Sequence, residues 1–238
     1  MKMRMVWLLT VVAFIAAGAK IYELSVSFDG LERSLLAYGE AVALLRMGSD
    51  DLTKKARLFV ETGDVAYMDG YFRQANVLKI RDQALDCIDG VPDDQGARKR
   101  LSNALGQSFE LMKIECHAMK LAALAHGTST NLVASSVMAY PLEPGEEELP
   151  AKGAGSKREK AIRMLYDNEY SGYKDRICGA ADCFLVDTLA SLRTKRESLH
   201  KSYTIWLFGQ FAVFLVAIAV SCPYVFGAGG SSAEREEK

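Results

Sequence analysis

A run of 24 uncharged residues, 203–226, restricts the folds open to this chain more than any other feature. At about 1.5 Å per residue, a helix of that length extends about 36 Å and can cross a bilayer with some tilt. Tyr203 and Trp206 lie near one end of the run and Tyr224 near the other, as interfacial aromatic residues do in membrane spans. A soluble core helix of this length would normally have a polar face. The run therefore predicts a transmembrane helix over residues 203–226.

A second uncharged run, residues 5–19, follows a basic N-terminal tetrapeptide. Fifteen residues are fewer than the roughly 20 needed to span hydrocarbon. The side chain of Lys20 can reach the interface while apolar residues continue the same helix to Leu24. We therefore expect a transmembrane helix over residues 5–24. A cleaved signal peptide is the alternative, because small residues at 16–19 precede Lys20.

The distribution of basic residues bears on the membrane topology. Lysine and arginine within residues 1–4 favour a cytoplasmic N-terminus, which places residues 25–202 outside and residues 227–238 in a short cytoplasmic tail. Basic residues just before the second span argue for the opposite orientation: Arg193, Lys195, Arg196 and Lys201. Long translocated segments escape the charge rule, so we expect the first orientation, and the conflict remains open.

An apolar pattern between the spans predicts a long helix. Apolar residues recur at alternating spacings of four and three, which is typical of the seam of a helix packed against other helices. The positions are Leu24, Phe28, Leu31, Leu35, Tyr38, Val42, Leu45, Leu52, Ala56 and Phe59, with Ser49 as the one polar member. Such a helix would be about 54 Å long and continuous with the first span. Ser49 either sets the register of the seam or marks a local loosening.

The segment Thr62-Gly63-Asp64 is expected to end this helix. Gly63 can adopt the left-handed C-cap conformation, and Asp64 can cap the helix that follows. Three more helices are predicted over 65–89, over 94–125, and from Ser156 directly into the second span, with an irregular loop at about 127–158. The predicted fold class is all-α: an antiparallel four-helix bundle, anchored to the membrane and flanked by two transmembrane helices.

Composition and motifs exclude several classes of function. A formal net charge of -1 leaves no whole-chain case for nucleic-acid binding. The sequence has no GxGxxG, Walker A, HExxH or GxSxG motif. Cys116 and His117 are adjacent, so on a helix they point about 100° apart and cannot share a metal. We therefore expect no enzymatic activity, no metal and no cofactor.

The sequence has five cysteines, an odd number, and no CxxC motif. Cys178 and Cys183 are too far apart around a helix to form a disulfide. One pair among residues 87, 116, 178 and 183 could bridge two helices in an oxidising compartment. Buried free thiols are the simpler interpretation.

Four segments resemble a known family. Residues 49–64, SDDLTKKARLFVETGD, resemble the end of the first helix in the four-helix-bundle sensor domains of bacterial methyl-accepting chemotaxis proteins and related membrane receptors. Residues 67–72, 111–119 and 167–174 are similar to the segments that follow in that family, and the resemblance covers roughly residues 5–226. At 117–118 this chain has His-Ala, where alanine usually precedes the methionine of the third helix.

The resemblance implies a two-pass protein of the bacterial inner membrane. Its extracytoplasmic domain would detect a stimulus, relay helix motion across the membrane and form a homodimer through bundle helices. Receptors of this family continue into a HAMP linker and an output domain, whereas this sequence ends twelve residues after the second span. The resemblance therefore implies a sensor without these domains, acting through a separate signalling protein or none.

Ligands of the family bind between helices or at the dimer interface. The corresponding candidates here are Arg57, Arg73 and Arg81, which would suit an anionic ligand; a solvated charged face is the alternative. A different function is also open: a structural or scaffold membrane protein whose bundle binds another membrane protein. An apolar stripe left unpaired after packing would favour it.

Overall fold

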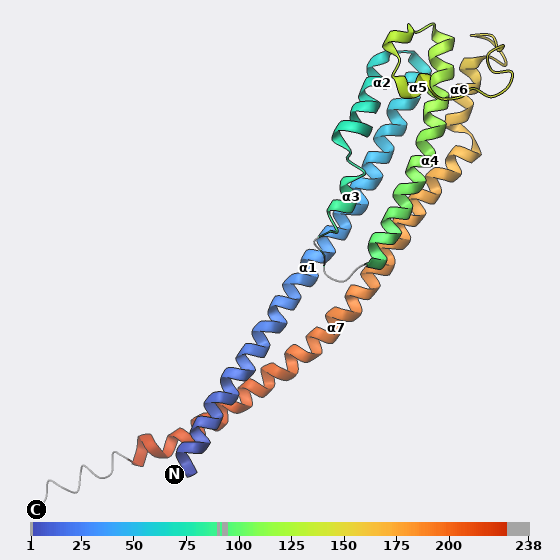
Figure 1. Cartoon of the computed structure of the whole chain (residues 1–238). Coiled ribbons are helices and arrows are strands. Elements are labelled where there is room, and N and C mark those ends of the chain that lie inside the picture. The colour runs from blue at the N-terminus through green and yellow to red at the C-terminus, as the bar shows by residue number, and fades with distance from the viewer. Residues whose placement is uncertain (1, 90, 92–94, 228–238) are drawn as a thin grey trace, which may run out of the picture. The chain divides into compact units, whose positions relative to one another are not determined.

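The computed structural model describes residues 2–89, 91 and 95–227, and all regular secondary structure in these ranges is helical (Figure 1). The longer helices are α1 (Lys2–Thr62), α2 (Val65–Phe72), α4 (Gln95–His126), α6 (Lys157–Tyr166) and α7 (Asn168–Gly227). The shorter ones are the π-helix η1 (Arg73–Leu78), α3 (Gln83–Asp86), the 3-10 helix η2 (Thr130–Leu132) and α5 (Ser135–Met138). The described residues contain no strand, which confirms the all-α prediction.

The chain divides into two compact units. The central unit is Ser34–Leu189, and the terminal unit combines Met1–Arg33 with Ala190–Lys238. Helices α1 and α7 contribute residues to both units.

Within the terminal unit, α1 and α7 lie against each other through aromatic contacts. The rings of Phe14 and Phe214 have centroids 6.4 Å apart, and those of Phe28 and Tyr203 are 6.1 Å apart and nearly perpendicular. Edge-to-face geometry of this kind is favourable because the positive ring edge meets the negative ring face.

Two helical segments are long and apolar enough to cross a membrane, one in Met5–Thr62 and one in Lys157–Ser221. Their most apolar 18-residue windows are 6 % and 0 % buried, whereas the core helix of a soluble protein would be mostly buried. Most side chains in these two windows therefore lie on the surface of the unit.

In the central unit, the predicted seam of α1 faces the core. Seven of its positions are buried: Tyr38, Val42, Leu45, Ser49, Leu52, Ala56 and Phe59. Leu35 is the exception at 42 % exposure, and the neighbouring Ser34 is buried in its place. Ser34 lies four residues before Tyr38 and eight before Val42, so these three buried residues share one face of the helix.

The predicted turn after α1 is confirmed. Gly63 has φ 73° and its N–H donates to the carbonyl of Phe59 at 2.8 Å. The Asp64 carboxylate accepts from the N–H of Ala66 at 2.9 Å and so caps α2. Glycine suits this position for a second reason, since an added Cβ would lie 2.6 Å from Cγ of His126.

The prediction of a single helix over 65–89 is wrong. The chain forms α2, widens into the π-helix η1, turns at Lys79 with φ 50°, and resumes as the short α3. The interruption lets the backbone at Arg81 approach α1 closely at Gly48, where a Cβ would lie 2.8 Å from the Arg81 nitrogen. The predicted breaker at 90–94 falls almost wholly outside the described residues.

The third predicted helix is confirmed as α4, and the fourth is interrupted. Ser156 caps α6 as expected, accepting from the N–H of Glu159 at 3.1 Å. At Asp167 the backbone becomes extended, and the Asp167 carboxylate then caps α7 by accepting from the N–H of Tyr170 at 2.7 Å. From Asn168 the helix continues without a break to Gly227.

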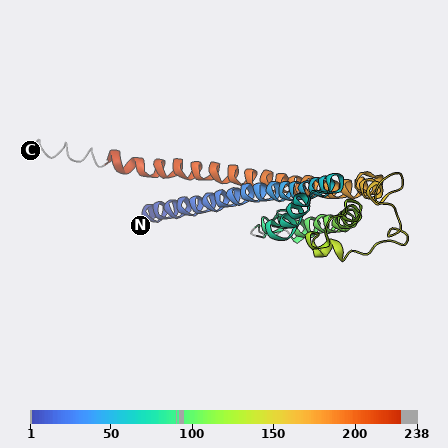
Figure 2. The same cartoon turned by 90° about the horizontal axis from the view of Figure 1, so that it is seen from above.

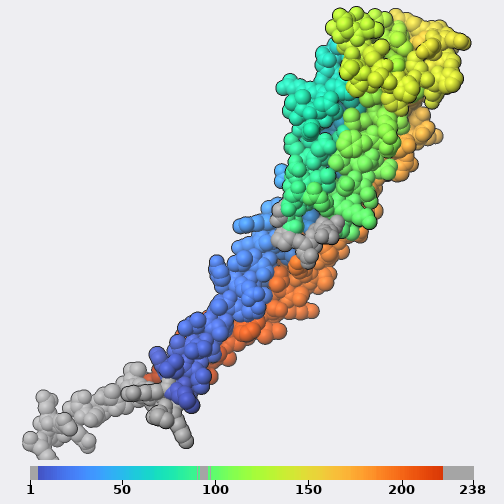
Figure 3. All heavy atoms as spheres, in the orientation of Figure 1, coloured from blue at the N-terminus to red at the C-terminus, as the bar shows by residue number. Residues whose placement is uncertain are grey.

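The helices of the central unit enclose one apolar core. Seen from above, α2, α3 and α4 lie on one side of the pair formed by α1 and α7 (Figure 2). The connecting segment 127–156 covers one end of these helices (Figure 3). The largest fully buried side chains of the core are Tyr71, Tyr170, Phe59, Met68, Leu111, Met119, Leu121 and Leu165.

Candidate functional site

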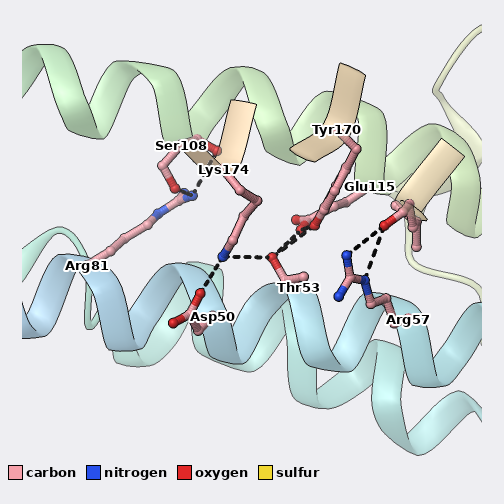
Figure 4. Close-up of polar contacts among 9 residues, drawn as sticks. Asp50, Thr53, Arg57, Arg81, Ser108, Glu115, Tyr170 and Lys174 are labelled. Carbon is pink, nitrogen blue, oxygen red and sulfur yellow. Dashed lines mark hydrogen bonds and ion pairs between the residues drawn. The ribbon is translucent and has the colours of Figure 1, made fainter. Parts of the chain in front are cut away.

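A buried carboxylate lies at the centre of this core. Glu115 of α4 is 1 % exposed, and burying an unpartnered charge would cost several kcal/mol. Three hydroxyls donate to it from three other helices. Thr53 and Tyr170 reach Oε1 at 3.1 and 2.7 Å (Figure 4). Tyr71 reaches Oε2 at 2.7 Å. The carboxylate therefore links α1, α2, α4 and α7 through hydrogen bonds.

Burial dominates the electrostatics of this network. It raises the pKa of Glu115, while the hydrogen bonds from the three hydroxyls and the charge of Lys174 act in the opposite direction and offset only part of the rise. Burial likewise raises the pKa of Tyr71 and of Tyr170, so both phenols keep their protons near neutral pH.

A surface pocket of about 370 Å³ adjoins the network on the face formed by α1, α6 and α7. Its lining residues are Asp50, Thr53, Lys54, Arg57, Leu58, Glu61, Tyr166 and Lys174. Thr53 belongs to both features, because its hydroxyl accepts from Lys174 Nζ at 3.4 Å while donating to Glu115 (Figure 4). Lys174 also forms an ion pair with Asp50. The pocket and the buried carboxylate are thus joined through one threonine.

Arg57 forms one wall of the pocket and is held from two directions. Its Nε and Nη2 donate to the carbonyl of Leu165 at 3.2 and 2.8 Å. That carbonyl lies in the last turn of α6, where no helical N–H is left to satisfy it. The guanidinium also lies 4.2 Å from the ring centroid of Tyr166 and 5.3 Å from that of Tyr170, within the range of cation–π attraction.

The three arginines singled out from the sequence do not form one site. Arg57 lines the pocket, whereas Arg73 is exposed on η1. Arg81 is buried, donates to the carbonyl and hydroxyl of Ser108, and lies 4.2 Å from the ring of Phe109. Burial lowers the pKa of Arg81. Its contacts tie the segment after η1 to α4, which is a structural role.

The turn residues Thr62, Gly63 and Asp64 make the contacts of a helix terminus. The Thr62 hydroxyl donates to the carbonyl of Leu58 at 2.6 Å and accepts from the N–H of Asp64 at 3.2 Å. None of the three lines the pocket on α1, α6 and α7.

Sequence reasoning did not identify Glu115 or Lys174 as site residues. A usable signal was present for Glu115, since it lies four residues after Leu111 and four before Met119, both of which are buried. A carboxylate at a core position of an apolar helix face requires partners, and its tyrosine and threonine partners are also polar groups at core positions.

A second buried carboxylate holds the connecting segment in place. Glu146 accepts from the N–H of Glu143 at 2.6 Å, hydrogen-bonds His117 Nε2 at 2.8 Å and forms an ion pair with Lys160 at 2.7 Å. Burial acts to raise its pKa, but the bonds to Lys160 and His117 outweigh it and hold the pKa of Glu146 below its ordinary value. The His117 ring stacks on Tyr140, with centroids 5.1 Å apart. These contacts tie the segment to α4 and α6.

Among the described residues, no three His, Cys, Asp or Glu side chains are placed to hold a metal ion. The described cysteines, 87, 116, 178 and 183, are free. Cys183 is exposed and the other three are only partly buried, so the expectation of buried thiols is wrong.

Neither the family models, nor the curated proteins, nor the solved structures contain a match to this chain.

Proposed function

We propose that this protein is a membrane-anchored sensory module. In this proposal the central unit is an antiparallel four-helix bundle outside a bacterial inner membrane, and residues 5–24 and 203–226 are its two spans. The observation that carries the proposal is helix continuity. Helices α1 and α7 each extend without interruption from a span-length apolar run to residues that line one pocket, among them Thr53 and Lys174.

Continuity matters because an α-helix is stiff along its axis. The ion pair between Lys174 and Asp50 joins α7 to α1 at the pocket, and the hydroxyl of Thr53 connects the same point to α4. A molecule that drew Lys174 away from Asp50 would release one of the contacts that set the relative height of α1 and α7. Interhelical shifts of about 1–2 Å are a recognised means of transmitting a signal.

The proposal also includes a homodimer. Several apolar side chains of the central unit are exposed on α1 and α7, including Leu36, Met47 and Val186. Exposed apolar surface of this kind supports self-association. It supports equally the second candidate function, a scaffold that binds another membrane protein. Cross-linking in membranes distinguishes them: a sensor is expected to yield a homodimer band, and a scaffold a band with a different protein.

A chimera tests signalling without knowledge of the stimulus. Residues 1–226 would be joined to the HAMP linker and kinase-control domain of a chemoreceptor, and kinase activity measured in membranes. Lys174→Met removes the ion pair to Asp50 and is expected to shift kinase activity. Lys152→Met changes an exposed lysine outside the pocket and is the matched control. Equal activity of the two variants would contradict the proposal.

The orientation has its own test. Alkaline phosphatase fused at residue 150 is expected to be active, because this position would lie outside the membrane. An inactive fusion with normal expression would overturn the orientation with residues 25–202 outside.

A further inference from the structure

In the pocket on α1, α6 and α7, the basic side chains are more available to a ligand than the acidic ones. Its two carboxylates are engaged: Asp50 pairs with Lys174, and Glu61 accepts from the Tyr166 hydroxyl at 2.6 Å. Lys54 is exposed at the rim. Arg57 donates to a backbone carbonyl, and its guanidinium group lies beside the pocket.

Asp50 pairs with the ammonium group of Lys174 as the carboxylate of a ligand would. Its side chain is 69 % exposed, so it can leave the ammonium group at little cost in burial, whereas the Lys174 side chain is only 20 % exposed. An incoming carboxylate would meet the ammonium of Lys174 and the guanidinium of Arg57, with the ring of Tyr166 and the side chain of Leu58 as apolar walls. The site therefore suits a small carboxylate with an apolar body.

Lys174 also supports the buried charge of Glu115, to which it is connected through the hydroxyl of Thr53. The charge of Lys174 favours the ionised form of Glu115 against the burial that opposes it. An external anion on Lys174 would weaken this support and would add its own negative charge on the same side of Glu115.

The titratable groups around Glu115 already carry their protons, so Glu115 is the group that can take up another. From α2 and α7 it faces Tyr71 and Tyr170, whose raised pKa values keep them neutral. On its own helix, burial raises the pKa of Cys116 to about 12, so the thiol is neutral. Arg81, in the segment after η1, is a further charged group that interacts with Glu115.

We propose that this pocket binds a small carboxylate and that Glu115 takes up one proton from solvent when the carboxylate binds. The inference rests on the proposed function only in taking the pocket as the stimulus site. The incoming anion replaces Asp50 on Lys174 and one proton moves from solvent to a carboxyl oxygen of Glu115, so the complex carries the same net charge as the free protein. The protonated carboxyl becomes a donor, so one hydroxyl must turn. Tyr170 has an alternative acceptor in Thr53, 2.9 Å away.

Affinity is then linked to pH. Because the bound state holds the additional proton, binding tightens as pH falls, by at most about tenfold per pH unit. This pH dependence is confined to the pH range between the pKa of Glu115 in the free protein and its pKa in the bound protein.

Calorimetry on the full chain in lipid nanodiscs tests both parts. Acetate and benzoate serve as carboxylate probes, acetamide and benzamide as neutral controls, at pH values between about 6 and 7.5 where a free carboxylate is ionised. Each titration is repeated in two buffers of different ionisation enthalpy, since the difference in heat counts protons taken up. We expect a carboxylate to bind with proton uptake and the amides not to bind. Failure of both carboxylates to bind, or binding without proton uptake across this range, would overturn the proposal.

Two variants locate the effect. Glu115→Gln keeps a hydrogen-bonding group in the core and is expected to bind the probe without proton uptake or pH dependence. Lys174→Met is expected to weaken probe binding and to raise the pH at which the Glu115 carboxyl carbon titrates in ¹³C NMR spectra, whereas Lys152→Met changes neither. Unchanged proton uptake in Glu115→Gln would assign the proton to another group and refute the inference.

The outcomes separate this inference from the proposed function. Carboxylate binding with proton uptake in a protein whose chimera shows no response to Lys174→Met would leave the inference standing and contradict the sensory role. A responsive chimera without proton-linked binding would do the reverse.

Discussion

Replacing Gly63 by alanine imposes two separate costs on the turn between α1 and α2. The first is conformational, because an L-residue at φ 73° is less stable than glycine by about 1–2 kcal/mol. The second is steric. The new Cβ would lie 2.6, 2.8 and 3.0 Å from Cγ, Nδ1 and Cδ2 of His126, so the imidazole must move.

Moving the imidazole also lowers the stability of the folded protein. His126 Nε2 lies 3.2 Å from the carbonyl of Val60, and a displaced ring would lose that hydrogen bond. Overpacking of this kind costs about 1–3 kcal/mol. Together the two terms predict that Gly63→Ala lowers the free energy of unfolding by about 3 kcal/mol. The measurement is urea denaturation of residues 34–189, with unfolding monitored by circular dichroism.

Gly127 offers a matched control. It has φ 67°, but no heavy atom lies within 4 Å of its ideal Cβ, so Gly127→Ala should incur only the conformational cost of about 1–2 kcal/mol. A double-mutant cycle with His126→Ala isolates the steric term, which should disappear when the ring is removed. If Gly63→Ala is no more destabilising than Gly127→Ala, the contact with His126 is refuted. If both are neutral, the argument from left-handed φ is refuted as well.

Further predictions use the same fragment and assay. Tyr71→Phe removes a donor from the buried carboxylate of Glu115 and should cost about 1.5–3 kcal/mol; a loss near zero would show that the carboxylate does not depend on this hydroxyl. Asp64→Ala removes the cap of α2 and should cost about 1 kcal/mol, most of it recovered in Asp64→Ser. Because the folded state raises the pKa of Glu115, stability should fall as pH rises from about 4.3 through the raised value, and Glu115→Gln should abolish that slope. For Glu146, whose pKa is lowered, stability should instead be lost as pH falls below about 4.3, and a Glu146→Gln variant with the same acid slope would contradict this assignment.

Features that depend on neighbouring residues were predictable from the sequence. The alternating four and three spacing predicted a helical seam, and the buried positions of α1 confirm it from Tyr38 to Phe59, whereas Leu35 before them is exposed. The Gly63 turn and the Ser156 cap were also predictable, because each requires a particular residue type within one or two turns of helix. Length and apolar content alone identified the two segments able to cross a membrane.

Features that depend on contacts between distant residues were decided only by the tertiary structure. The helix predicted over 65–89 is interrupted where Arg81 meets Gly48 on α1, and no local pattern encodes that approach. The network around Glu115 joins it to partners 62, 44 and 55 residues away in the chain. A buried carboxylate needs donors in three dimensions, and helical periodicity specifies only which residues share a face of one helix. For the same reason the sequence by itself determined the helices and their apolar faces, while packing decided that Arg57 borders a pocket and Arg81 a core.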